Sequence, residues 1–165
     1  MASQNFTLTK ELLHEYFEYR DGILYSKKRR GYSKVGNKNG CKNFDGYIMI
    51  GFLKNRLYAH RMIFLMHHGY LPETVDHIDC NKENNKIENL RAATLAQNNL
   101  NMPLNKRNTS GVKGVSWNKQ NKNWRVTVKV NNKSTYFGSF KNIEDAKIVA
   151  EKVREKHFKE FARHE

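Results

Sequence analysis

The chain is poor in cysteine and proline, and it has no long apolar run. Its 165 residues include only two cysteines, Cys41 and Cys80, which are too few for a disulfide framework and lack zinc-finger spacing. No run approaches the ~20 apolar residues of a membrane-spanning helix, and the N-terminus lacks the basic flank and apolar stretch of a signal peptide. We therefore expect free thiols, no membrane association and a soluble, intracellular protein.

Acidic residues are also scarce. There are 16 Asp and Glu against 30 Lys and Arg, so the formal net charge is +14. This excess favours a nucleic acid as the partner over a small molecule. From residue 20 to residue 61 the only acids are Asp21 and Asp45, and none lies between Asn89 and Ile143. The charge alone allows DNA or RNA, so an RNA-binding or RNA-cleaving protein stays open at this point.

The apolar fraction, 38% with 12% aromatic residues, is sufficient for a folded core in one medium domain or two small ones. Residues 101–110 are polar, contain Pro103 and show no periodicity, as is typical of a linker. We predict an α+β protein with a region over 1–100, this linker, and a second domain over 111–165.

The first region alternates short helices, strands and basic loops. We expect a helix over 11–17 capped by Thr9, a strand over 19–26, a hairpin of 47–52 and 56–58, and a helix over 60–68. Gly69 would end this last helix. The connection after residue 26 carries a basic cluster that we assign to DNA phosphates: Lys27, Lys28, Arg29 and Arg30.

Residues 75–101 concentrate imidazole, carboxylate and amide groups. The pattern predicts a strand over 75–78, a polar loop over 79–88, a strand over 89–93 and a helix from Leu95. Neighbours in a strand point to opposite faces, so Asp76 and His77 cannot project alike. Hard oxygen donors beside a general base are what a magnesium-dependent phosphodiesterase requires. The plainer alternative is an Asn-rich loop around an ordinary core histidine.

Several of these positions together resemble a known family. The segment Asp76-His77-Ile78-Asp79, the Asn-rich loop, Asn89-Leu90-Arg91, Thr94 and Gln97-Asn98 are similar to the ββα-metal core of HNH endonucleases, especially the homing endonucleases of phages. The last motif position is Asn98 rather than histidine, as in that phage subgroup. The resemblance places the protein in the cytoplasm of a phage-infected or bacterial cell.

The resemblance also implies site residues and a cofactor. Asp76 and Asn98 would ligate a divalent ion, Mg²⁺ or alternatively Mn²⁺, His77 would be the general base, and Asn89 would pin the loop through backbone hydrogen bonds. The implied products are a 5′ phosphate and a 3′ hydroxyl. The segment Tyr58 to Arg61 resembles one found upstream in the family. We include Arg61 among the DNA-binding candidates, although packing is the favoured role for His60 and Arg61.

The second domain shows a clear strand pattern. Trp124, Val126, Val128 and Val130 alternate with polar residues, so one face is apolar and the other basic. We expect a turn at Asn131-Asn132, a strand over 133–140 and a helix capped by Asn142. The apolar stripe of this helix would cover the valines. Both Trp117 and Trp124 are expected in the core.

This half resembles the Apetala-type, ethylene-response-factor-like DNA-binding domain. The similarity rests on Gly114-Val115, the Trp124-Arg125 strand, Phe137-Gly138-Ser139-Phe140 and Glu144-Asp145-Ala146. It implies that the sheet enters the major groove. The residues assigned to DNA in this half are Arg125, Thr127 and Lys129 on the strand, and Lys113 and Lys133 at phosphates.

Together these patterns predict an endonuclease that hydrolyses a phosphodiester bond of double-stranded DNA. One motif per chain favours a monomer that nicks one strand, as a homing endonuclease with a C-terminal targeting domain. The alternative is a non-catalytic DNA-binding protein, such as a transcription regulator on the same fold.

Overall fold

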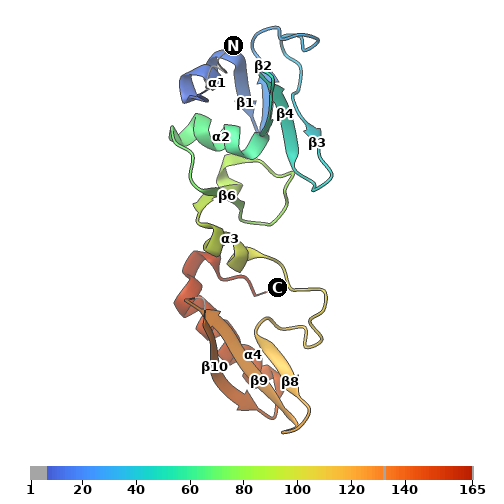
Figure 1. The fold of residues 1–165 in the computed structure, drawn as a ribbon, viewed down its shortest axis with the longest axis vertical. Coiled ribbons are helices and arrows are strands. Elements are labelled where there is room, and N and C mark those ends of the chain that lie inside the picture. Colours follow the sequence, from blue (N-terminus) through green and yellow to red (C-terminus); the bar gives the residue numbers. More distant parts are fainter. Residues whose placement is uncertain (1–6, 132, 165) are drawn as a thin grey trace, which may run out of the picture. The chain divides into compact units, whose positions relative to one another are not determined.

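The structure, a computed structural model, describes residues 7–131 and 133–164 and forms two compact units, Met1–Leu95 and Ala96–Glu165. Small antiparallel sheets and four α-helices make up both units (Figure 1), so the predicted α+β class is confirmed. Within the described residues, no helix is long and apolar enough to cross a membrane. The functional division of the chain into a nuclease region, linker and targeting domain stays a prediction.

The first unit opens with helix α1 (Lys10–Tyr16), whose N-cap is Thr9 as predicted. Its side chain accepts a hydrogen bond from the backbone N of Leu12. The single strand expected over 19–26 is wrong: β1 (Phe17–Arg20) and β2 (Ile23–Ser26) form a hairpin. The chain reverses at Asp21 and Gly22, which both have positive φ angles, 48° and 82°. Glycine adopts this conformation without the strain that a Cβ imposes.

A second sheet follows, in the order β3 (Cys41–Lys42), β4 (Ile48–Phe52) and β5 (Asn55–Tyr58). The predicted hairpin is present. The sequence predicts its turn at Lys54-Asn55. The two turn residues are instead Leu53 and Lys54, with φ angles of 48° and 64°, one position earlier. Helix α2 (Ala59–His68) then ends at Gly69, whose φ of 77° is the left-handed conformation of a helix C-terminus.

Helix α2 is the centre of the first core. Seven of its ten residues are buried, and only its C-terminal histidines and Arg61 reach solvent. Apolar side chains from α1, both sheets and the following hairpin pack around it, including Leu13, Phe17, Leu24 and Ile50. The sequence predicts Met62, Ile63, Leu65 and Met66 as the buried side of this helix, and all four are buried.

The hairpin of β6 (Thr74–His77) and β7 (Leu90–Ala93) closes the first unit. A polar loop and a 3₁₀ turn, η1 (Ile87–Asn89), connect the two strands. Helix α3 (Leu95–Asn101) begins at the last residue of this unit, and its other residues belong to the second unit. Strand, loop, strand and helix occur in the predicted order.

The second unit is a sheet of β8 (Val115–Asn118), β9 (Asn123–Val130) and β10 (Lys133–Phe140) packed on α4 (Ile143–Phe158), followed by η2 (Lys159–Phe161) (Figure 1). Val126 and Val128 are buried against Ala146 and Ala150, and Asn142 caps α4, as predicted. The core assignment of Trp117 is wrong. This residue is 43% exposed on edge strand β8, with its ring edge-on to Trp124. Asn132, half of the predicted turn, lies outside the described residues.

Candidate active site

Strand β6 presents two polar residues to opposite sides, as its alternation requires. Asp76 and His77 are only 4% and 5% exposed. Asp76 lies directly across the ladder from Arg91, and His77 from Leu90. Buried polar side chains are costly unless they are bonded, so the partners of these two residues define the site.

Asp76 forms a buried ion pair with Arg91. The guanidinium Nε donates to Oδ2 of Asp76 over 2.8 Å, and the two side chains are 5% (Asp76) and 15% (Arg91) exposed. Cross-strand neighbours share a face of the sheet, so the ladder register itself brings the charges together. The pair fixes the orientation of the carboxylate.

His77 bonds on its own side of the strand to Asn85, which is 2% exposed. Its Nε2 lies 2.9 Å from the amide oxygen Oδ1 of Asn85. An amide oxygen only accepts, so Nε2 carries the proton and donates it. The neutral imidazole then has its basic lone pair on Nδ1. This is the tautomer that a general base at Nδ1 needs.

A second histidine packs against the first. The ring centroids of His60 and His77 are 4.9 Å apart, and the ring of Tyr47 lies 5.3 Å from His60 and 6.1 Å from His77. Burial, together with His77 and Arg61, lowers the pKa of His60 to about 3. Nδ1 of His60 is buried without a hydrogen-bond partner among the described residues. His60 is therefore a neutral packing residue, as expected.

Asn89, directly after the loop over 79–88, closes this loop through hydrogen bonds to Asp79 and Asn84. Oδ1 of Asn89 accepts from the backbone N of Asp79 at 3.1 Å, and Nδ2 of Asn89 donates to the backbone oxygen of Asn84 at 2.8 Å. Nδ2 also donates to Oδ1 of Asp79 at 2.9 Å. Burial raises the pKa of Asp79, but hydrogen bonds from Asn84, Asn81 and Asn89 outweigh it and lower that pKa overall. These bonds are of the kind predicted for Asn89, and its catalytic importance stays a prediction.

The hairpin of β1 and β2 supports the same loop from one side. Lys86 pairs with Asp21 at 2.9 Å, and the backbone N of Ile87 donates to the hydroxyl of Tyr19 at 3.0 Å. Gly22 approaches so closely that a Cβ there would lie 2.8 Å from the backbone N of Lys86. The loop that carries Asn85 thus has a fixed support.

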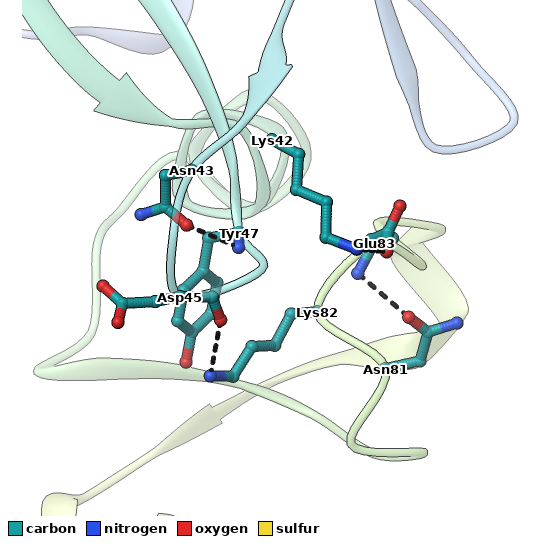
Figure 2. A network of polar contacts seen from close by, with 7 residues as sticks. All are labelled: Lys42, Asn43, Asp45, Tyr47, Asn81, Lys82 and Glu83. Atoms are coloured by element: carbon teal, nitrogen blue, oxygen red, sulfur yellow. Dashed lines mark hydrogen bonds and ion pairs between the residues drawn. The ribbon is translucent and has the colours of Figure 1, made fainter.

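The turn between β3 and β4 supports the loop from another direction (Figure 2). Lys42 pairs with Glu83, and Lys82 donates to the backbone oxygen of Asp45 at 2.9 Å. The ammonium of Lys82 also lies 4.5 Å from the ring centroid of Tyr47. Residues far apart in the sequence therefore hold one loop beside His77.

The second expected metal ligand, Asn98, is a half-buried residue of α3 within the second unit. Its pairing with Asp76 stays a prediction. Among the residues that the structure describes, no three His, Cys, Asp or Glu side chains form a metal-binding group. A carboxylate and an amide are hard oxygen donors, which suit a cation such as Mg²⁺ that also keeps water and phosphate ligands.

The comparison with protein families and curated relatives agrees with this arrangement. Residues 57–100 match the family model of the HNH endonucleases. These residues include α2, the β6–β7 hairpin and most of α3. The chain is also 42% identical over 89 residues to Protein 3.8 of Escherichia phage T7, a match that covers 54% of this chain and 73% of that protein. The chain belongs to the HNH endonucleases.

A second relative carries the name of the family. The chain is 36% identical over 110 residues to an uncharacterized HNH endonuclease of Acanthamoeba polyphaga mimivirus. This match covers 65% of the chain and 56% of the mimivirus protein, so the chain spans little more than half of that relative. No solved structure matches the chain significantly. The HNH assignment makes the protein a nuclease.

The N-terminal basic candidates of this HNH nuclease differ in their surroundings. Lys27, Lys28 and Arg29 are exposed, although Lys27 donates to the backbone oxygen of His14 and Lys28 pairs with Glu15. The guanidinium of Arg30 bonds to Asn39 at 2.6 Å and lies 4.3 Å from the ring centroid of Phe17. Arg61 donates to the backbone oxygens of Pro72 and Glu73. Their roles at DNA stay predictions.

The candidates of the second unit lie mainly on the sheet. Arg125, Lys129 and Lys133 are exposed and Thr127 is half-buried. The guanidinium of Arg125 lies 5.2 Å from the ring centroid of Tyr136 on the neighbouring strand. Lys113 donates to the backbone oxygens of Met102 and Arg163.

Sequence reasoning missed two residues of the site. Asn85 was a loop residue without a role, and nothing in an Asn-rich loop distinguishes it before the loop is folded. Arg91 was part of a motif without a partner. The hairpin register that opposes it to Asp76 depends on the length and shape of the loop between the strands.

Proposed function

We propose that the chain is a divalent-metal-dependent endonuclease that nicks double-stranded DNA, acting as a homing endonuclease in the cytoplasm of a phage-infected or bacterial cell. The observation that carries this proposal is the bond between His77 and Asn85, which puts the basic lone pair of a buried imidazole on Nδ1. The net charge of +14 supports a polyanionic substrate.

His77 acts as the general base. Its Nδ1 takes a proton from a water molecule as the water oxygen bonds to phosphorus, and the bond from phosphorus to the 3′ oxygen breaks. The products are a 5′ phosphate and a 3′ hydroxyl, which receives its proton from solvent. Asn85 holds the ring and its tautomer during the transfer, and the imidazole of His60 packs on the ring.

Asp76 and Asn98 would hold the divalent ion, together with phosphate oxygens of the DNA. The ion, Mg²⁺ or Mn²⁺, would stabilise the negative charge on the leaving 3′ oxygen. Arg91 orients the Asp76 carboxylate through its hydrogen bond to Oδ2. With only two protein ligands, the affinity for the ion should be low until DNA is bound.

The second unit provides the targeting surface in this proposal. The exposed, basic face of β9 carries Arg125 and Lys129, whereas the opposite face packs on α4. An Apetala-type mode of binding, with the sheet in the major groove, would use these residues and Thr127. The enzyme would act as a monomer that cuts one strand.

The test is supercoiled plasmid DNA incubated with the protein and Mg²⁺, with and without EDTA. We expect open-circle product that EDTA abolishes. His77→Ala and Asp76→Ala should each prevent nicking while the variants still bind labelled duplex DNA. Both residues are buried, so circular dichroism must show that the variants are folded.

Three results would contradict the proposal or a part of it. Binding without cutting under Mg²⁺ and Mn²⁺ would indicate a non-catalytic DNA-binding protein. Undiminished nicking by folded His77→Ala would remove His77 from the reaction. Linear plasmid at early times would show that the enzyme cuts both strands instead of nicking one.

A further inference from the structure

One aromatic side chain next to the site is fully exposed to solvent. Phe44, in the turn between β3 and β4, has a relative exposure of 105%. A single exposed apolar side chain is common on protein surfaces, so what distinguishes Phe44 is the turn that holds it and the neighbours of that turn. Neither the proposed chemistry nor the packing of the first unit uses this ring.

The turn that carries Phe44 is rigid. Two hydrogen bonds join Asn43 and Tyr47. The backbone N of Asn43 donates to the backbone oxygen of Tyr47, and the backbone N of Tyr47 donates to Oδ1 of Asn43, both over 2.8 Å. The backbone N of Gly46 donates to the oxygen of Asn43 at 3.1 Å. Phe44 is therefore presented by a closed turn and not by a loose loop.

The same turn is attached to the loop beside the catalytic histidine (Figure 2). Lys82 bonds to the backbone oxygen of Asp45, and Lys42 on the adjoining strand pairs with Glu83. The ring of Tyr47, at the end of the turn, lies 6.1 Å from His77. Phe44 is three residues before Tyr47, so their Cα atoms are at most about 10 Å apart.

The charges around the turn suit DNA only in part. Lys42 and Glu83 neutralise each other in their ion pair. The ammonium of Lys82 can face a phosphate, whereas Asp45 adds a carboxylate. An apolar side chain that enters the base stack does not depend on phosphate contacts. Proteins commonly insert such side chains between base steps and kink the duplex.

We propose that Phe44 inserts against the base stack of the DNA, on the side of the cut phosphodiester where the turn between β3 and β4 adjoins the loop beside His77. The inference rests on the proposed function, since it takes duplex DNA as the substrate. Phe44 then sets the position of the DNA sugar-phosphate backbone relative to His77. Loss of its stacking should weaken DNA binding about 10-fold or more, a typical value for one aromatic residue on a base.

The test uses the full chain and a short fluorescein-labelled duplex in EDTA, where no cutting interferes. Phe44→Ala should bind about 10-fold more weakly than the unchanged protein and nick plasmid more slowly. Leu53→Ala is the matched control. Leu53 is 48% exposed in the turn at the opposite end of β4, and its truncation should change neither quantity.

A second variant reads the contact directly. Phe44→Trp adds an indole at the turn, and its emission, taken as the difference from the unchanged protein, should be quenched when duplex is added. Thermal unfolding of both Phe44 variants should be unchanged, because the native ring is fully exposed.

The outcomes separate the two proposals. If the unchanged protein nicks plasmid and Phe44→Ala binds and nicks as well as Leu53→Ala, the role of Phe44 is wrong while the nuclease proposal stands. The same holds if Phe44→Trp binds duplex without quenching, or if Phe44→Ala changes only the oligomeric state in gel filtration. If the unchanged protein neither binds nor cuts DNA, both proposals fail.

Discussion

Arg91 donates to Asp76 across the β6–β7 ladder, and the two charges are buried together. Removing one partner of a buried pair leaves the other uncompensated, so Arg91→Met should lower the free energy of unfolding by about 3 kcal/mol. Urea unfolding measures this. The double variant Asp76→Asn, Arg91→Met should recover part of the loss, because no charge is left buried. A double variant as unstable as the sum of both single ones would contradict the coupling.

Asn85→Ala removes the acceptor that fixes the tautomer of His77. We expect the nicking rate to fall by about 10- to 100-fold, as is typical when the residue that orients a functional histidine is lost. DNA affinity should stay the same, since Asn85 is buried and cannot touch DNA. Asn55→Ala, on an exposed strand end, is the control and should nick normally. Equal losses of binding and rate would indicate a collapsed loop instead.

The order of elements could be predicted from the sequence because caps, turns and alternation are local signals. Thr9, Gly69 and Asn142 each end or begin a helix as predicted. The single strand over 19–26 is wrong because the turn at Asp21-Gly22 divides the segment, which leaves two strands of only four residues each. Short hairpins of this kind give too little periodicity to separate them from one longer strand.

The site was only partly accessible from the sequence for a related reason. Asp76 and His77 could be recognised because they are adjacent and chemically distinctive. Their partners, Arg91 and Asn85, come from a strand and a loop whose placement depends on the folded hairpin. Trp117 shows the limit for packing, because an alternating pattern does not reveal that β8 is an edge strand.

Gly22 lies against the backbone of the loop over 79–88. A Cβ there would lie 2.8 Å from the N of Lys86 and 3.0 Å from the carbonyl carbon of Asn85, at a φ of 82°. Gly22→Ala should therefore lose stability and nick more slowly. Gly36→Ala is a matched control, since its φ is 81° but nothing lies within 4 Å. It should lose only the strain of the left-handed conformation, about 1 kcal/mol. Identical unfolding curves for the two variants would contradict the contact.

His60 should make the protein sensitive to acid. Its pKa is about 3 in the fold against 6.5 for the exposed side chain, so the unfolded chain takes up a proton first as the pH falls. The stability from neutral His60 is complete above about pH 6.5 and is lost toward pH 3, at about 1.4 kcal/mol per pH unit. When the pH is lowered from about 7 to about 5, the free energy of unfolding measured in urea should fall by about 2 kcal/mol less for His60→Phe than for the unchanged protein. Parallel curves would show that His60 is hydrated.

Arg125 tests the targeting surface independently of the chemistry. Its guanidinium is exposed on β9 beside the ring of Tyr136, where it can reach a phosphate or a base edge. Arg125→Ala should weaken duplex binding, and if the contact is a phosphate, the slope of log affinity against log salt should fall by about 0.9. Lys152→Ala removes the same charge from the exposed side of α4 and should leave the slope unchanged, because α4 packs on the opposite face of the sheet. Equal changes in both variants would mean that the net charge of the unit, and not the β9 face, attracts the DNA. An unchanged curve for Arg125→Ala alone would remove this residue from the interface.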